Sequence, residues 1–193
     1  MNETAIQLTA IALTAAGLIV TIIIFYLQVK MQTETERASN YQTLEFAANE
    51  ALRFEAEHHE FIDPFMTREK SAAAENLTDA YASSYVYQVL TLFEIATRFY
   101  KRGYIDEEVF ISWIVWFFSM LNSWYFRENW MEIRINYTDD IREIFDMPVR
   151  RYSLHGGTDD ARGQFFLHVS KVLKRPQIHE EYKGNLQEAD NGA

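Results

Sequence analysis

Histidine and carboxylate side chains gather in one short stretch, from Glu55 to Asp63. On a helix, Glu55 would share a face with His58 or with His59, at spacings of three and four residues. Such pairs bind zinc or iron, but a di-iron bundle needs two Glu-x-x-His motifs and this domain has one. Two interpretations follow, a metal site of Glu55, His58 and His59 or an acidic, solvated helix surface. We favour the second and expect no metal and no cofactor.

A second stretch with possible chemistry is His155-Gly156-Gly157, which precedes a helix expected to start at Thr158. Glycines before a helix N-terminus can bind an anion. Here Asp159 and Asp160 stand where the anion would lie, so a plain turn with Thr158 as the N-cap is favoured. Gly-x-Ser-x-Gly and His-Glu-x-x-His motifs do not occur either. The sequence therefore gives no catalytic residues.

The composition indicates long helices. The 193 residues are 48% hydrophobic and 15% aromatic, with 7 Gly and 3 Pro. Few turn formers and many large apolar side chains favour an all-α fold with one domain of ordinary size. The net charge of −10 argues against nucleic-acid binding, and the lack of cysteine excludes disulfides and thiolate metal sites.

After a short segment at residues 1–4, residues 5–29 form an uncharged apolar run. As a helix, these 25 residues would extend about 37 Å, which exceeds a hydrocarbon core of about 30 Å. A cleaved signal peptide would begin with basic residues, whereas Glu3 is the one charged side chain before the run. We therefore predict a single transmembrane helix that contacts the lipid bilayer.

Lys30 and Arg37 are the nearest basic residues, and both follow the run. By the positive-inside rule they place the C-terminal domain in the cytoplasm, on the plasma (inner) membrane of a bacterial-type cell.

Residues 30–63 are expected to continue the membrane helix as a stalk, because no Gly or Pro lies between Gly17 and Pro64. The stalk carries an apolar stripe at helical spacing that needs a covering surface. Its members are Leu44, Ala47, Ala51, Phe54, His58 and Phe61, of which Leu44, Phe54 and Phe61 are the candidate interaction residues. Asp63-Pro64 should end the stalk.

Residues 64–175 read as a helical bundle. A helix from Thr78 and an aromatic helix at about 107–133 should form a hairpin, with Gly103 as the C-cap between them. A shorter helix at 138–145 should be ended by Pro148, and the helix from Thr158 should complete the bundle. Residues 176–193 are polar and acidic and are predicted to be disordered.

Residues 109–126 allow three interpretations, because they form an uncharged run of 18 residues. The run could be a second membrane span, a helix on the membrane surface or the core helix of the bundle. Its serines, its asparagine and its many aromatic residues favour the core helix.

Charge is unevenly distributed along the chain. Residues 31–63 hold 8 acidic and 2 basic side chains, whereas residues 149–175 hold 6 basic and 2 acidic ones, among them Arg150, Arg151, Lys174 and Arg175. The basic segment could contact anionic lipid or an acidic partner. Alternatively it packs against the acidic stalk of its own chain, which we favour.

The segment Phe93-Glu94-Ile95-Ala96, the segment Phe99 to Glu108 and the aromatic helix after them resemble a bacterial family. Its members are small helical proteins with an N-terminal membrane anchor, classified as a domain of unknown function. The resemblance covers about residues 40–135. It implies the architecture described above and no catalytic residue.

The leading hypothesis is a single-pass, non-enzymatic accessory, scaffold or regulatory subunit of a membrane-associated complex, with a protein partner or a second copy of itself. One alternative is a membrane-tethered metal-binding protein or metalloenzyme. Another is a membrane-acting defence or toxin component.

Overall fold

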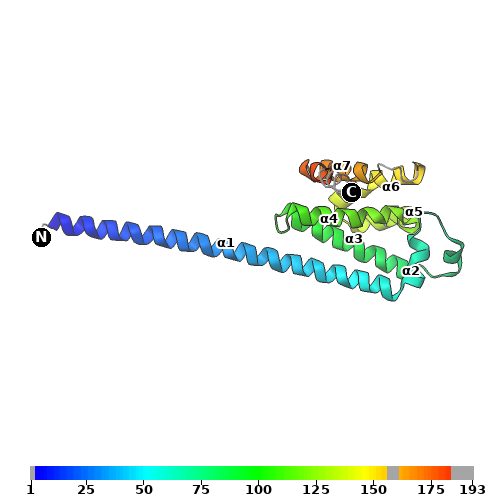
Figure 1. The fold of residues 1–193 in the computed structure, drawn as a ribbon, viewed down its shortest axis with the longest axis horizontal. Coiled ribbons are helices and arrows are strands. Elements are labelled where there is room, and N and C mark those ends of the chain that lie inside the picture. Colours follow the sequence, from blue (N-terminus) through cyan, green and yellow to red (C-terminus); the bar gives the residue numbers. More distant parts are fainter. Residues whose placement is uncertain (1–2, 156–160, 184–193) are drawn as a thin grey trace, which may run out of the picture. The chain divides into compact units, whose positions relative to one another are not determined.

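The computed structural model describes residues 3–155 and 161–183, and for residues 3–17, 20 and 153–155 it describes the helix without the side chains. The chain divides into two compact units, Met1–Tyr41 and Gln42–Ala193. One helix, α1 (Glu3–Glu57), forms the first unit and the beginning of the second (Figure 1). It has no break, as the missing Gly and Pro after Gly17 predicted.

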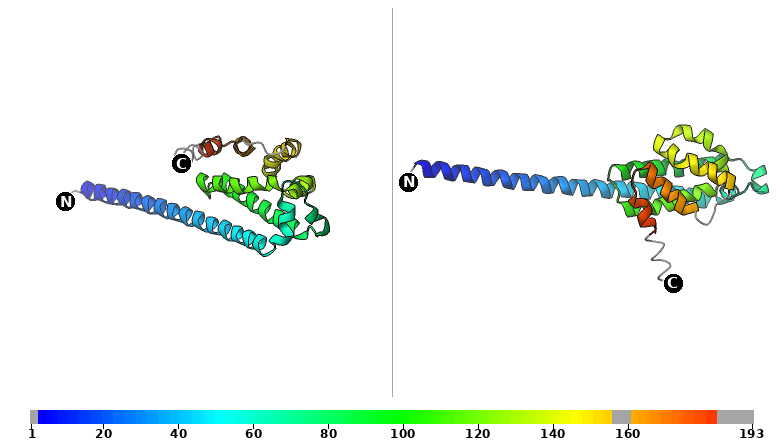
Figure 2. Two further views of the ribbon diagram at one scale, coloured as in Figure 1. Left: turned by 45° about the vertical axis from the view of Figure 1, so that its right-hand side comes forward. Right: turned by 90° about the horizontal axis from the view of Figure 1, so that it is seen from above.

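The second unit is a bundle of helices, and no strand occurs in the described residues. After α1 the elements are α2 (His59–Met66), the 3-10 turn η1 (Ala72–Asn76), α3 (Ala80–Lys101), α4 (Glu107–Ser119), η2 (Met120–Asn122), α5 (Trp124–Ile133), η3 (Arg134–Asn136), α6 (Asp139–His155) and α7 (Ala161–Val172). Figure 1 and the left view of Figure 2 show α6 and α7 above the α3–α4 pair.

The predicted hairpin around Gly103 is confirmed. The α3 and α4 helices are antiparallel, because Phe93 stacks on Phe117 with 4.0 Å between ring centroids and Tyr100 stacks on Phe110 at 4.3 Å. Gly103 has φ +72°, the left-handed conformation that a C-cap requires. The hairpin supplies two of the walls of the core.

The core is rich in aromatic side chains. Phe145 of α6 lies in its middle, with ring centroids 5.7 Å from Phe93, 5.2 Å from Phe126, 5.5 Å from Trp130 and 5.8 Å from Phe165. All five side chains are almost completely buried. Burying one such ring stabilises a fold by roughly 1.5–3 kcal/mol.

The prediction of one aromatic helix over residues 107–133 is wrong. The chain bends by 98° between Glu107–Asn122 and Trp124–Asn136. At the bend Ser123 is extended, and its Oγ accepts a hydrogen bond from Phe126 N at 3.0 Å, which starts α5. The N-cap formed by Ser123 interrupts a run of apolar residues that by itself predicts one continuous helix.

Both proline breaks were also predicted wrongly. The first helix ends at Glu57, and Pro64 lies inside α2, while Pro148 lies inside α6. A proline removes one backbone donor, but packing on either side can hold the helix together. Ile62 and Phe65 beside Pro64 are buried, as are Phe145 and Val149 beside Pro148.

The disordered tail was predicted from residue 176, yet residues 177–183 are helical. Ile178 is 0% exposed, and Tyr182 stacks on Phe166 with 4.0 Å between centroids. The packing of Ile178 and Tyr182 outweighs the polar composition of residues 177–183. The tail prediction for residues 184–193, and the proposed Thr158 cap, lie outside the described residues.

Within the described part of the chain, no single helix combines the length and apolarity that a membrane crossing requires, but the bent pair Glu107–Asn122 and Trp124–Asn136 does so together. Most large apolar side chains of α4 lie in the core of the second unit. The core interpretation of residues 109–126 therefore agrees with the fold.

Candidate functional site

The structure separates the three candidate metal ligands. Glu55 Oε2 accepts a hydrogen bond from Tyr85 Oη at 2.7 Å, whereas the His58 ring lies against Tyr81, with 4.6 Å between centroids and an angle of 39° between the ring planes. His59 is exposed, with its Nδ1 3.1 Å from Ala56 O. In the described residues no three His, Asp or Glu side chains gather as metal ligands would.

The reason is a backbone break that helical spacing could not reveal. His58 has φ −124° and ψ 20°, which lie outside the α-helical region, so α1 ends before it and α2 begins after it. Glu55 and the two histidines therefore do not share one regular helix face. The sequence placed them on one face because no Gly or Pro marks this break.

Most of the predicted apolar stripe is buried or half-buried in the second unit, but Ala47 is exposed. Leu44 is 1% exposed and Phe54 is half-buried, with its ring centroid 6.2 Å from that of Tyr81 in α3. Phe61 of α2 stacks on Tyr81 at 5.0 Å. Tyr81 of α3 therefore contacts two of the three candidate interaction residues, Phe54 and Phe61, and Leu44 belongs to the buried core of the same unit.

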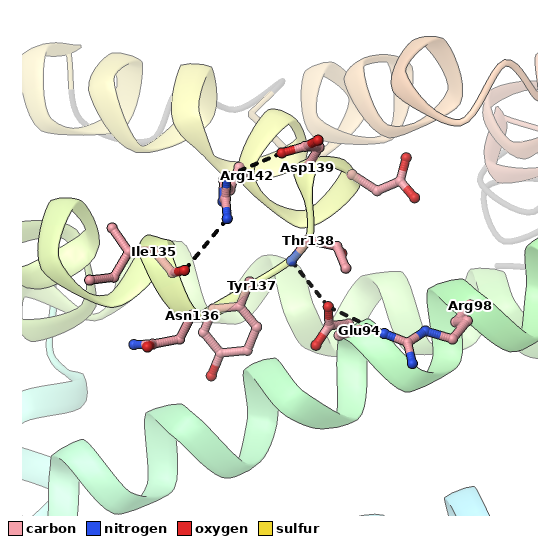
Figure 3. A pocket seen from close by; sticks show the side chains of 9 residues that line it. Glu94, Arg98, Ile135, Asn136, Tyr137, Thr138, Asp139 and Arg142 are labelled. Carbon is pink, nitrogen blue, oxygen red and sulfur yellow. Dashed lines mark hydrogen bonds and ion pairs between the residues drawn. The ribbon is translucent and has the colours of Figure 1, made fainter.

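An open cleft of about 790 Å³ lies between α3 and the start of α6, and Figure 3 shows its side chains. Glu94 Oε1 accepts a hydrogen bond from Thr138 N at 3.1 Å and lies 3.6 Å from Arg98 Nη2. Its carboxylate therefore satisfies a backbone donor just before α6 begins, where the helix dipole favours a negative charge. The lining comprises Glu94, Arg98, Ile135, Asn136, Tyr137, Thr138, Asp139, Asp140 and Arg142.

The charged groups of this cleft already have partners in the fold. Arg142 pairs with Asp139 at 3.1 Å, and Lys101 Nζ reaches Asp140 Oδ2 at 2.6 Å. Burial raises the pKa of Tyr137 to about 12, so this phenol stays protonated at neutral pH. The nine lining residues include no histidine or cysteine to serve as a base or nucleophile. The residues that line the cleft connect α3 to α6 through these contacts, and they include no catalytic set.

The four basic candidate residues are not brought together. His168 Nε2 of α7 lies 2.8 Å from Glu143 O of α6, and Phe165 packs on Phe145, so the two helices are antiparallel. Arg150 and Arg151 therefore lie near the end where α7 begins, and Lys174 and Arg175 lie at the other end. All four are exposed. The described residues contain no ion pair between segment 149–175 and the acidic stalk.

A contact that the sequence did not reveal joins the end of α2 to the start of α5. The main-chain carbonyls of residues 64, 65, 67 and 68 accept hydrogen bonds from three residues, Ser123, Trp124 and Arg127. Trp124 donates twice, from its backbone N at 2.9 Å and from Nε1 at 3.0 Å. We call this contact the carbonyl clamp. It satisfies carbonyls that a helix end leaves without partners.

The carbonyl clamp gathers basic and aromatic side chains that stand far apart in the sequence. Arg68 and Arg127 each lie over the Tyr152 ring, with guanidinium carbons 5.8 and 5.4 Å from its centroid. Lys70 Nζ lies 5.3 Å from the ring centroid of Trp124. We call these five residues the basic-aromatic cluster. No local motif predicts it, because its members come from three separate segments, residues 68–70, 124–127 and 152.

Comparison with known proteins gives no relative: no protein-family model, no curated protein and no solved structure matches this chain. The resemblance to a bacterial family with a membrane anchor therefore stays an expectation from the sequence.

Proposed function

We propose that this chain is a single-pass membrane protein whose helical domain acts as a non-enzymatic accessory subunit by binding another protein. The observation that carries the proposal is the surface of α1. Ten large apolar side chains between residues 18 and 31 are each at least 46% exposed. No charged residue occurs from 5 to 29. A bilayer would cover this surface.

The energy of that surface supports an apolar surrounding. Each large apolar side chain moved from water into hydrocarbon contributes roughly 1.5–3 kcal/mol. Ten large apolar side chains on one helix form an apolar surface of a kind that soluble proteins rarely leave exposed. Lys30 and Arg37 after the run support a cytoplasmic domain.

The binding role rests on two features of the second unit. The polar cleft between α3 and α6 contains no catalytic set, as described above. On α5 and η3, Met131 and Ile135 are 59% and 70% exposed and stand four residues apart, so they share one side of the helical segment. Contact with a partner protein would remove both side chains from water.

The membrane part is tested in intact cells with single cysteines, which the cysteine-free sequence allows. Asn2→Cys and Asn40→Cys stand on the two sides of the apolar run. With a membrane-impermeant maleimide we expect labelling of Asn2→Cys in intact cells and of Asn40→Cys after permeabilisation alone. Alkaline carbonate should leave the chain in the pellet. Release into the supernatant, or equal labelling of both cysteines, would refute the anchor.

The binding part is tested by purification of the full chain in mild detergent, followed by mass and light-scattering analysis. Met131→Glu with Ile135→Glu should remove the bound protein while the helix content stays unchanged. Leu52→Glu, on an exposed apolar residue of α1, is the matched control and should retain the partner. A monomer without bound protein in the wild type would contradict the role.

A further inference from the structure

The exposed side of α5 and η3 carries two large apolar side chains that the core does not use. Phe126, Trp130 and Ile133 bury the other side of α5 in the core. Met131 and Ile135 are exposed, and Ile135 lies at the edge of the cleft drawn in Figure 3. Covering this pair is favourable, because both side chains then leave water.

Two carboxylates stand beside the apolar pair. Glu128 and Glu132 are both exposed. Glu128 precedes Met131 by three residues and Glu132 precedes Ile135 by three, so each carboxylate shares a side of the helical segment with an apolar neighbour. We call Glu128, Met131, Glu132 and Ile135 the acidic-apolar surface.

The basic residues of the same segment form their hydrogen bonds elsewhere. Arg134 donates to both carboxylate oxygens of Asp146, from Nε at 2.9 Å and from Nη2 at 2.6 Å. Arg127 Nη1 donates to Leu121 O at 2.5 Å. Burial lowers the pKa of Arg127 and the charge of Glu128 acts against this, so Arg127 offsets part of one negative charge. The net charge of −10 on the whole chain adds to the attraction of a basic partner.

The charge of this surface favours one kind of covering partner over others. Two carboxylates repel anionic lipid headgroups. A second copy that docked through the same surface by two-fold symmetry would bring the carboxylates of both copies together, and like charges repel. A basic segment of another protein avoids both costs. Its apolar side chains would cover Met131 and Ile135 while its Lys or Arg side chains paired with Glu128 and Glu132.

We propose that the acidic-apolar surface binds a basic amphipathic segment of the partner protein, in which Lys or Arg side chains flank large apolar ones. This inference rests on the binding role proposed above and adds the chemistry of the partner. Apolar contact removes the exposed pair from water, and charge complementarity sets the orientation of the bound segment and speeds its association.

The test uses the full chain in the cells that produce it, with the photocrosslinking residue p-benzoylphenylalanine in place of Met131. Irradiation joins this residue to whatever lies on the surface, and mass spectrometry of the adduct gives the sequence of the attached peptide. We expect a peptide of net positive charge with large apolar residues between Lys or Arg residues. The same photocrosslinker in place of Leu52, an exposed apolar residue of α1, is the positional control and should not give this adduct.

Charge variants in the same background test the two carboxylates. Glu128→Lys with Glu132→Lys should lower the adduct yield about tenfold or more, because like charges then face each other across the contact. Glu128→Gln with Glu132→Gln should lower it less. Glu60→Lys with Glu75→Lys makes the same change of charge at two exposed residues of other elements and should give the wild-type yield. Since all four glutamates are exposed, circular dichroism should show the same helix content in every variant.

The outcomes separate this inference from the binding role on which it rests. An adduct with a neutral or acidic peptide overturns the inference alone, because a partner is then present without the predicted chemistry. An adduct that survives Glu128→Lys with Glu132→Lys undiminished does the same. An adduct with lipid or with a second copy of the chain also overturns it. If no adduct forms at all, the surface binds nothing, and the binding role fails together with the inference.

Discussion

At the scale of single residues, Thr97 is an exception in the core. Its side chain is 2% exposed, and its hydroxyl has no hydrogen-bond partner within the described residues. A buried hydroxyl without a partner keeps the cost of leaving water, on the order of 1–3 kcal/mol. Valine has nearly the same shape and avoids that cost.

We therefore expect Thr97→Val to raise the free energy of unfolding by about 1 kcal/mol, which corresponds to a rise in Tm of about 2–4 °C for a chain of this size. Thermal denaturation followed by circular dichroism measures it. Thr97→Ala is the control, because it removes the hydroxyl but leaves a cavity, and it should not be stabilising. A lower Tm for Thr97→Val would mean that the hydroxyl has a partner in the folded protein.

Residue identities alone could not have given the candidate sites. The metal hypothesis assumed that Glu55, His58 and His59 lie on one helix, and the backbone break at His58 removes that condition. The basic-aromatic cluster is the opposite case. Arg127 and Tyr152 look like ordinary surface residues until the fold brings them to Arg68. Spacing predicts neighbours within one helix and cannot predict neighbours from different helices.

At the scale of secondary-structure elements, the α3–α4 hairpin depends on the left-handed conformation of Gly103. A Cβ atom at this position would meet nothing within 4 Å, so a substitution is opposed by backbone conformation and by no steric clash. An alanine in the left-handed region costs roughly 1–2 kcal/mol.

Gly103→Ala should therefore lower the free energy of unfolding by about 1 kcal/mol, measured in urea denaturation. Gly103→Asn should lower it less, because asparagine tolerates this conformation better. The neighbouring residue Arg102 has the αR conformation, so Arg102→Ala serves as the control, with little expected change in the free energy of unfolding. If both alanine variants denatured like the wild type, the turn would not contribute to stability.

The elements were predictable where one local signal dominated. Gly103, with Lys101 and Arg102 before it and Asp106 after it, marked the hairpin correctly. The same reasoning failed at Pro64 and Pro148, since buried neighbours hold α2 and α6 together through both prolines. It also failed at Ser123, whose side chain starts α5 and bonds to Phe65 O. These outcomes depend on tertiary packing, which no local pattern contains.

At the scale of the whole molecule, the buried apolar side chains that the structure describes all lie in one of the two units. They begin at Leu44 and end at Ile178, and the unit is Gln42–Ala193. The unit therefore contains the packing that a cooperative fold needs. The first unit adds exposed apolar surface to the chain.

A chain that begins at Gln42 should accordingly fold without detergent, with a cooperative thermal transition within a few degrees of that of the full chain. A chain that begins at Leu52 is the control, because it lacks Leu44, Ala48 and Ala51 of the core. We expect it to be less stable by about 2 kcal/mol or more, from the loss of Leu44 burial alone. A broad, non-cooperative transition of the longer fragment would show that the second unit needs the first.

The two sides of the carbonyl clamp, the acceptors and the donors, differ in how well they tolerate substitution. Its four acceptors are main-chain atoms, which remain whatever side chains occupy residues 64, 65, 67 and 68. Three of the four bonds to those acceptors come from the side chains of Ser123, Trp124 and Arg127, so these residues are hard to replace. The side chains of Arg68 and Lys70 can therefore vary while the backbone between α2 and η1 keeps its path. Related chains could exchange these two side chains, and with them the charge of this surface, without refolding the domain around it.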